Sequence, residues 1–393
     1  MENSELSTPA PSEPERRAFL GVSLRTLLGA VVIPFVLQRA LLCAIGVFAA
    51  EFIPQRRAFL AHPLPSVAGL DIWMRWDSLF YLAVAERGYV AGDGIHAAAF
   101  FPLYPALSAA LAVILPLPVA AWLVANLAAL LALILLYVLV RETEDTELAR
   151  RSVLVALVFP TSFFLSAVYA ESTYLALCLG AVLAYVRKRQ LLAALLVGAA
   201  CLARPQGFVC LTVPFALAWL IRSRRWRELP WFTLGALLGA GLLLSVHYFS
   251  SGDPLAFLHS STVRSLGAFK GEARSQASHW AVLLDEGLGP NLMRRLLNWG
   301  ALLLVLLSAV HWLRRKNFEF AALTLLTLAV PLVFHATLFD AASMARYTLL
   351  AFPVFIAIAR WSLSGSRAWL TDTGFVMLQS MLFALFASNY WVE

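Results

Sequence analysis

A run of acids, bases and aromatic residues follows the first long apolar segment of the chain. It extends from Arg75 to Tyr89 and reads RWDSLFYLAVAERGY. If residues 71–87 form one helix, four polar side chains share a face: Asp71, Arg75, Ser78 and Glu86. Asp77 then lies about 120° from that face, beside aromatic residues, which predicts a pocket that uses this carboxylate. The alternative is an interfacial helix whose aromatic rings lie at the lipid headgroups and whose charges are solvated.

Two arginines stand where apolar segments end or begin. Arg204 precedes Pro205, so its backbone is biased away from helix and the chain breaks there. Arg346 precedes Tyr347 at the start of another segment. If both arginines lie at the outer ends of their segments, they could converge on a phosphate, which the planar guanidinium fork binds well. The alternative is that each arginine only anchors the chain at the headgroups.

Two further charges fall in or beside apolar segments. Glu171 follows Tyr169 at a corner between two apolar runs, and a buried carboxylate costs a few kcal/mol in a bilayer. We therefore expect Glu171 to face a polar cavity or an opposite charge. Arg39 lies in the middle of the first apolar segment and needs a partner or a wet cavity, and the sequence identifies no partner for it.

Composition places the chain in a membrane. Apolar residues make up 61% of its 393 residues and charged residues only 13%, with a mean hydropathy of +0.78. These values exclude an ordinary soluble domain, and the apolar segments between residues 26 and 390 predict an all-α polytopic membrane protein with about 11 membrane-spanning helices. The segment 98–117 is rich in proline, so we expect it to be re-entrant or tilted.

Basic residues give the expected orientation. The net charge of +7 comes mainly from short clusters between apolar segments, which favours the positive-inside pattern over nucleic-acid binding. The cytoplasmic clusters are 187–189, 222–227, 314–316 and 360–367. We expect residues 1–25 to be a disordered cytoplasmic tail and residues 26–393 to be a single catalytic domain. Its first outer loop, 51–97, would carry an amphipathic helix, and its second long outer loop would be 250–292.

Cysteine and histidine residues form no metal-binding spacing. All four cysteines lie in apolar stretches without a CxxC motif, so we expect them to be small core residues: Cys43, Cys178, Cys201 and Cys210. The seven histidines show no HExxH spacing. No metal site or other cofactor is predicted.

Several blocks of sequence together resemble the PIG-V family, the mannosyltransferases that add the second mannose of glycosylphosphatidylinositol anchors, and its bacterial relatives. The first block is 75–89, followed by AFFPLYP at 99–105. FPTSFF through YAES at 159–172, ARPQG at 203–207 and ARY at 345–347 follow in the same order. Family members often have Ser-Asn-Gly where this chain has Pro205-Gln206-Gly207, which puts the role of Gln206 in question.

The resemblance implies a GT-C glycosyltransferase fold with an active site on the outer face and a polyprenyl-phosphate mannose donor. It implies an inverting transfer in which Asp77 is the general base and in which Arg204 and Arg346 bind the leaving phosphate. The other substrate-binding residues that we expect are Arg75, Trp76, Tyr81, Glu86, Tyr104, Glu171, Gln206 and Tyr347. The product would be an α-mannoside on an extracytoplasmic lipid, glycan or protein, made at a bacterial plasma membrane.

Two alternatives to a mannosyltransferase remain, one with a different sugar donor and one from a different class of protein. Another polyprenyl-phosphate sugar, such as glucose or arabinose, would use the same residues. A transporter or flippase for lipid-linked sugars would also contain buried charges and broken helices, but such proteins have internal repeats, and no repeat is evident in this sequence.

Overall fold

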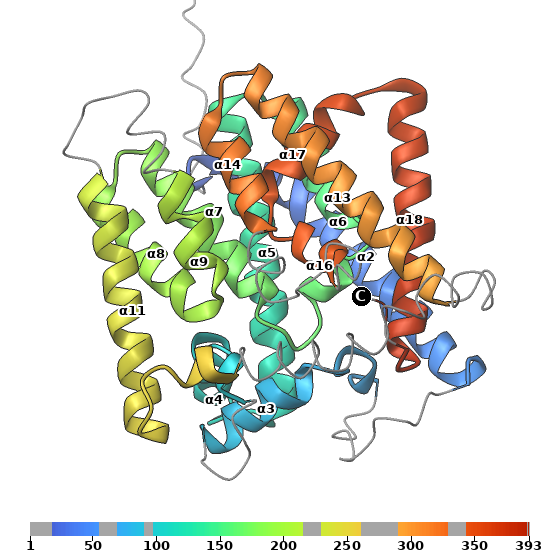
Figure 1. The fold of residues 1–393 in the computed structure, drawn as a ribbon. Helices are drawn as coiled ribbons and strands as arrows, with labels where there is room; N and C mark the ends of the chain where they lie inside the picture. Colours follow the sequence, from blue (N-terminus) through green and yellow to red (C-terminus); the bar gives the residue numbers. More distant parts are fainter. Residues whose placement is uncertain are drawn as a thin grey trace, which may run out of the picture.

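A computed structural model describes residues 18–54, 69–89, 97–214, 229–260, 290–328, 343–390 and 392. Within these residues the fold is almost entirely helical (Figure 1). The predictions for the start of the tail, for the basic cluster 222–227 and for most of the loop 250–292 lie outside the described residues.

The first half of the chain begins with two short strands and continues as helices. The strands are antiparallel, with Ala18 opposite Ser23 and Phe19 opposite Val22. The elements are β1 (Ala18–Phe19), β2 (Val22–Ser23), α1 (Leu24–Leu27), the π-helix η1 (Leu28–Val32), α2 (Ile33–Phe52), the 3-10 helix η3 (Asp71–Trp73), α3 (Ser78–Arg87), the 3-10 helix η4 (Ala97–Ala99), α4 (Leu103–Leu111), α5 (Leu117–Thr143), α6 (Thr146–Val158) and the 3-10 helix η5 (Ser162–Leu165).

The second half is helical throughout its described residues. Its elements are α7 (Glu171–Val186), α8 (Gln190–Ala203), α9 (Gln206–Cys210), α11 (Leu229–Ser251), α13 (Pro290–Arg314), α14 (Phe318–Thr327), α16 (Met344–Thr348), α17 (Phe352–Trp361) and α18 (Gly365–Ala387).

Five of the described helical segments are long and apolar enough to cross a membrane. They are Leu24–Phe52, Leu117–Thr143, Trp231–Ser251, Arg295–Arg314 and Gly365–Ala387. Four shorter apolar helices accompany them, namely α7, α8, α14 and α17. The chain is therefore a multi-pass membrane protein. The nine residues of α4 would extend only about 14 Å, less than half of the hydrocarbon core of a bilayer, so α4 by itself does not cross.

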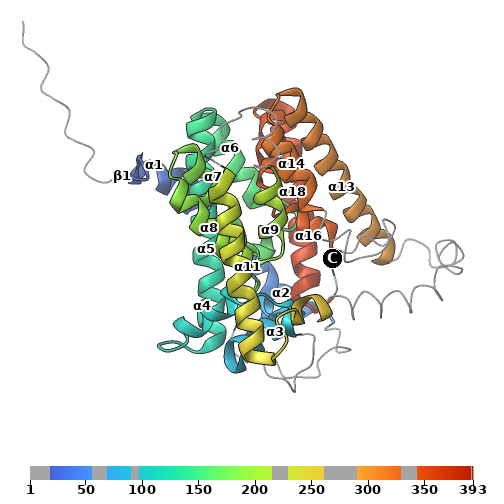
Figure 2. The ribbon, with the colours of Figure 1, turned by 60° about the vertical axis from the view of Figure 1, so that its left-hand side comes forward.

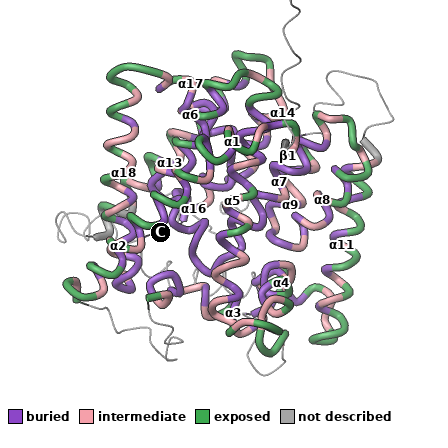
Figure 3. Tube along the Cα trace, turned by 180° about the vertical axis from the view of Figure 1, so that it is seen from behind, coloured by how far each residue is buried: buried purple, intermediate pink, exposed green. Residues whose placement is uncertain are grey.

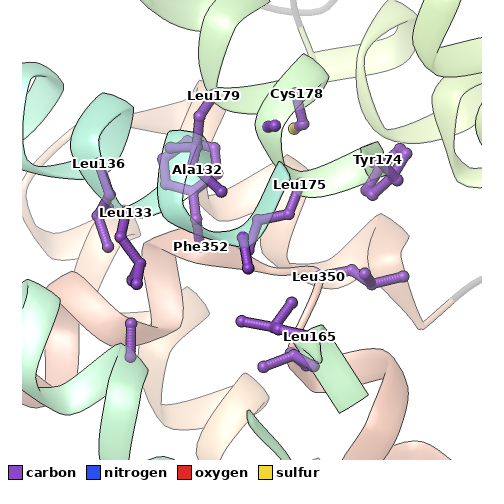
Figure 4. Packing of buried hydrophobic residues seen from close by; sticks show 14 of the residues in the cluster. Ala132, Leu133, Leu136, Leu165, Tyr174, Leu175, Cys178, Leu179, Leu350 and Phe352 are labelled. Carbon is purple, nitrogen blue, oxygen red and sulfur yellow. The ribbon is translucent and has the colours of Figure 1, made fainter. Parts of the chain in front are cut away.

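The core is built around α5 and α7, and Phe352 at the start of α17 belongs to the same hydrophobic cluster. Figure 4 shows Leu133 and Leu136 of α5, Leu175 and Leu179 of α7 and Phe352 of α17 within this cluster. The long helices at the periphery instead expose leucine and valine side chains, and Figure 3 shows this contrast between a buried centre and exposed outer helices. Since apolar side chains on the outside of a membrane protein face lipid, the peripheral helices form the lipid boundary.

Arg39 is buried in α2, and its described partners are amides and an aromatic ring. Its Nε donates to Asn126 Oδ1 at 3.2 Å, its Nη1 donates to Gln38 Oε1, and its guanidinium carbon lies 4.3 Å from the centre of the Phe35 ring. Asn126 Oδ1 also accepts from Ser166 Oγ at 2.8 Å. This network supplies the partners that the sequence did not identify, and it joins α2 and α5 to the segment that leads into α7.

Ion pairs gather at one end of the helix bundle. Glu142 in the last turn of α5 pairs with Arg187 at 2.5 Å, and Glu144, just after α5, contacts Arg360 at 2.6 Å and Arg315 at 3.5 Å. Three of the basic clusters predicted to be cytoplasmic therefore meet at a single end of the molecule. Helices α3 and α4 lie at the opposite end in both views (Figures 1 and 2).

Candidate active site

The segment before α3 is a turn, and the prediction of one continuous helix over 71–87 is wrong. Residues 71–73 form η3, Trp76 adopts a left-handed backbone with φ of 52°, and α3 begins only at Ser78. Arg75 explains the break, because its Nε and Nη2 donate to the carbonyl of Ala387 at 3.0 and 2.7 Å. That carbonyl belongs to the last turn of α18, where the helix supplies no partner. Arg75 thus ties the turn to the end of α18.

Asp77 is placed by this turn at the N-cap of α3. Its side chain makes no capping hydrogen bond. Instead Asp77 Oδ2 lies 2.9 Å from Nη1 of Arg346, and its side chain is 28% exposed. Because the helix is broken before Ser78, Asp77 does not share a helical face with Trp73, but its carboxylate contacts the buried Arg346.

Helix α7 begins inside the molecule, at Glu171, and helix α8 ends inside it, just before Arg204. The 16 residues of α7 extend roughly 24 Å, which is shorter than the ~30 Å hydrocarbon core. Glu171 is the first residue of α7, and Arg204 follows α8 with φ of −158° and ψ of 153°, the extended backbone expected before proline. Gly207 lets the chain turn back onto α8, since a Cβ there would lie 2.5 Å from the backbone of Ala200.

Four charged side chains converge at these ends, and we refer to them as the charged cluster: Asp77, Glu171, Arg204 and Arg346. Glu171 Oε1 is 2.6 Å from Arg204 Nη1, an ion pair that is not aligned as a hydrogen bond. The same oxygen accepts from Arg346 Nε, and Arg346 Nη1 reaches Asp77. Arg346 therefore links the two carboxylates, and Glu171 links the two arginines.

Burial separates the two carboxylates. The Glu171 side chain is 0% exposed and those of Arg204 and Arg346 are 8% and 7% exposed, whereas Asp77 is 28% exposed. The cluster is formally neutral, and a buried charge without a partner would be strongly destabilising. Glu171 is thus enclosed by its partners, while Asp77 is the more exposed of the two carboxylates.

Aromatic rings surround the arginines. The guanidinium carbon of Arg346 lies 4.4 Å from the ring centre of Tyr169 and 5.2 Å from that of Phe164, and Arg204 lies 5.5 Å from Tyr347. Cation–π contacts of this kind hold a guanidinium in place without neutralising it. Sequence reasoning missed Phe164 and Tyr169 as site residues, although both belong to the conspicuous block FPTSFF through YAES.

Tyr81 of α3 lies beside the cluster, next to Tyr169 and Tyr104. Its ring centre is 6.2 Å from that of Tyr169 and 5.2 Å from that of Tyr104. Burial raises the pKa of the Tyr81 hydroxyl well above its ordinary value, and the charges of all four cluster residues act on it. Tyr81 therefore remains a neutral hydrogen-bond donor and acceptor beside the cluster.

The remaining predicted site residues lie at varied distances from this centre. Gln206 is buried and accepts from Arg204 Nε at 3.3 Å. The Tyr104 hydroxyl donates to Ala121 O at 2.9 Å and so fastens α4 to α5. Glu86 is 68% exposed and lies 3.9 Å from Arg87, away from the cluster. Arg75 binds the end of α18, and Trp76 is half-buried in the turn beside it.

Among the described residues, no group of three His, Cys, Asp or Glu side chains is arranged to bind a metal.

A family model describes more than half of the chain. The model of glycosyltransferase family 87 matches residues 100–335, which include Glu171, Arg204 and Gln206. The chain belongs to this family. It is therefore a membrane glycosyltransferase, in agreement with the activity class expected from the sequence. Asp77 and Arg346 lie on either side of the matched residues.

Solved structures of an archaeal oligosaccharyltransferase are similar to the chain in outline. The Archaeoglobus fulgidus oligosaccharyltransferase in complex with Zn and sulfate has 16% identity and a TM-score of 0.47, over 90% of this chain and 53% of that protein. The apo form of the same protein has 12% sequence identity and a TM-score of 0.46, over 91% of this chain and 56% of that protein. The form tethered to an acceptor peptide has 14% sequence identity and a TM-score of 0.47, over 91% of this chain and 55% of that protein. This chain thus spans about half the length of those proteins. No curated protein matched the sequence.

Proposed function

We propose that this chain is a GT-C mannosyltransferase that uses polyprenyl-phosphate mannose and forms an α-mannoside on an extracytoplasmic lipid, glycan or protein acceptor. Membership of glycosyltransferase family 87 supports glycosyl transfer over transport of a lipid-linked sugar. The blocks of sequence that resemble the PIG-V family support mannose as the sugar. The observation that carries the proposal is the contact of the Arg346 side chain with two carboxylates, the partly exposed Asp77 and the fully buried Glu171.

Asp77 acts as the general base in this proposal. The acceptor oxygen attacks the anomeric carbon from the face opposite the phosphate, and Asp77 takes the proton of that hydroxyl group. The bond between the anomeric carbon and the phosphate oxygen breaks, and its electron pair leaves with the polyprenyl phosphate. Asp77 suits this role better than Glu171, since Asp77 is 28% exposed whereas Glu171 is 0% exposed and surrounded by arginines.

Arg204 and Arg346 stabilise the departing phosphate. The leaving group gains negative charge as the bond breaks, and fixed cations in a water-poor site stabilise that charge effectively. A guanidinium carries five N–H donors, and the contacts given above for Arg204 use its Nε and Nη1. A phosphate oxygen can therefore bind Arg204 without displacing Glu171. Glu171 holds the two arginines together before the donor arrives.

The recessed position of the cluster fits a lipid-linked donor. The cluster lies at the start of α7, just after the end of α8, and on the side of the bundle where α3 begins. We place this side outside the cytoplasm, in a bacterial plasma membrane, because the basic clusters lie at the other end of the bundle. Nucleotide sugars stay in the cytoplasm, so a sugar carried on a polyprenyl phosphate would be the available donor there.

Transfer of labelled sugar tests the proposed function. Purified protein is incubated with radiolabelled polyprenyl-phosphate mannose and a membrane extract, and in parallel with donors that carry glucose or arabinose. We expect label from mannose alone to enter an acceptor in a linkage that an α-mannosidase cleaves. Transfer only from glucose or arabinose would contradict the sugar, and transfer from none of the three donors would contradict the donor class.

A further inference from the structure

Two buried polar atoms in the site take no part in the ion pairs. Glu171 uses Oε1 for both arginines, and its Oε2 has no hydrogen-bond partner among the described residues. Gln206 uses Oε1 for Arg204, and its Nε2 likewise has no partner within the described part of the chain. Both residues are 0% exposed. Leaving a buried donor or acceptor unsatisfied costs about 1–3 kcal/mol, so a pair of them beside the charged cluster marks a candidate position for a polar group of a ligand.

A single guanidinium holds both groups. Arg204 contacts Glu171 through Nη1 at 2.6 Å and Gln206 through Nε at 3.3 Å. Its own position is fixed by the break at Pro205 and by the Tyr347 ring at 5.5 Å. Glu171 and Gln206 are therefore held by the same guanidinium, and a large movement of either side chain would break its contact with Arg204.

The chemistry of the pair selects a hydroxyl group over a phosphate. Glu171 Oε2 is an acceptor and Gln206 Nε2 is a donor, and a hydroxyl group can donate to the first while it accepts from the second. An ionised phosphate oxygen only accepts, so it would be repelled by the carboxylate. Arg204 and Arg346 are proposed to bind the phosphate, so Glu171 Oε2 and Gln206 Nε2 are available to bind the sugar that the phosphate carries.

We propose that Glu171 and Gln206 bind one hydroxyl group of the transferred sugar and so determine which sugar the enzyme accepts. The proposal rests on the proposed function and assigns it a recognition element. It also gives a reason for glutamine at position 206, since an apolar residue there would leave the carboxylate oxygen as the sole polar contact. A site built around such a hydroxyl group discriminates strongly against a donor that lacks it, because the buried atoms are then left unpaired.

Deoxy donors provide the test. The purified full chain is assayed with polyprenyl-phosphate mannose and with its 2-, 3-, 4- and 6-deoxy derivatives on the same prenol. We expect one deoxy donor to lose at least about 100-fold in kcat/KM while the others lose far less. The variant Gln206→Leu should use mannose poorly and should no longer distinguish that deoxy donor from mannose by more than a few-fold.

Gln379→Leu is the matched control. Gln379 is also buried, but its Nε2 already donates to the carbonyls of Leu157 and Phe159 at 2.9 and 2.8 Å. Its replacement should lower stability and leave the deoxy profile unchanged.

A flat profile of the wild-type protein over the four deoxy donors, with transfer of mannose intact, would overturn this proposal and leave the proposed function standing. This outcome does not depend on whether Gln206→Leu folds. A profile that Gln206→Leu leaves unchanged would overturn it as well. Absence of transfer from every polyprenyl-phosphate sugar would instead overturn the proposed function.

Discussion

At the scale of single residues, the site depends on one arginine with two acidic partners. Arg346 uses Nε for Glu171 and Nη1 for Asp77, and the rings of Tyr169 and Phe164 lie over its guanidinium. A planar fork can satisfy these directions together, whereas an ammonium group is a point charge on a flexible stem. The identity of this residue therefore matters beyond its charge.

Arg346→Lys tests that point. We expect kcat/KM for transfer to fall at least about tenfold, or about 1.4 kcal/mol of transition-state stabilisation, because a lysine cannot hold Asp77 and bind the phosphate in one plane. Arg187→Lys is the matched control, since Arg187 pairs with Glu142 at the opposite end of the bundle. Equal activity of both variants would show that Arg346 acts only as a positive charge.

Sequence predicted part of this arrangement. The extended backbone of Arg204 follows from Pro205, a local rule, and the structure confirms it. The convergence of Arg204 with Arg346 was predicted from the phosphate chemistry that two arginines can perform together. Neither inference identified Glu171 Oε1 as their common partner, because that contact depends on how α7, α8 and α16 pack.

At the scale of elements, short helices and broken turns place the site. The predicted helix over 71–87 does not form as one element. Arg75 instead donates to a carbonyl in the last turn of α18, and Trp76 has a left-handed backbone at the bend. Hydrophobic periodicity reflects only neighbours along the chain, so it could not predict a contact with the Ala387 carbonyl, which lies more than 300 residues away in sequence. Arg39 is similar, since its partner Asn126 lies on another helix.

The close packing of α11 on α8 offers a second test. Gly235 and Gly239 are spaced like the small residues of tightly packed membrane helices. A Cβ at Gly235 would lie 2.2 Å from Ala194 O, whereas at Gly241 it would meet nothing within 4 Å. We expect Gly235→Ala to cost about 1–3 kcal/mol, because backbone must move, and to lower the unfolding temperature of the purified protein.

Gly241→Ala lies on the same helix and controls for the change in helix propensity. It should leave the unfolding temperature unchanged or raise it slightly, since alanine favours helix by up to about 1 kcal/mol. If both variants unfold at the wild-type temperature, α8 and α11 are not in close contact through Gly235.

At the scale of the whole molecule, charges divide the bundle into two ends. One end carries the ion pairs of Glu142 and Glu144 with basic residues, and the other carries α3 and α4. Hydropathy predicted the membrane class and most long helices. It did not predict that α7 and α8 end inside the molecule, because their apolar ends are buried by neighbouring helices and not by lipid.

Orientation can be measured with exposed positions at the two ends. In a background without the native cysteines, Glu86→Cys should react with an impermeant thiol reagent added outside intact cells. Arg189→Cys should react only after permeabilisation, because it lies in a basic cluster beyond α7 and basic clusters favour the cytoplasm. Both side chains are exposed, so access to the reagent depends on the side of the membrane. The reverse labelling pattern would place the charged cluster on the cytoplasmic side.

Asp77, the more exposed carboxylate of the cluster, is proposed to accept the proton of the acceptor hydroxyl group, and the transfer assay with Asp77→Asn tests this role most directly. Asparagine keeps the shape of the side chain and removes its ability to take a proton, so mannose transfer should fall by at least about 100-fold. The variant should still fold and bind the donor lipid, which its unfolding temperature and donor binding will show. Transfer by Asp77→Asn at nearly the wild-type rate, together with an inactive Glu171→Gln variant, would contradict the claim and assign the base to Glu171.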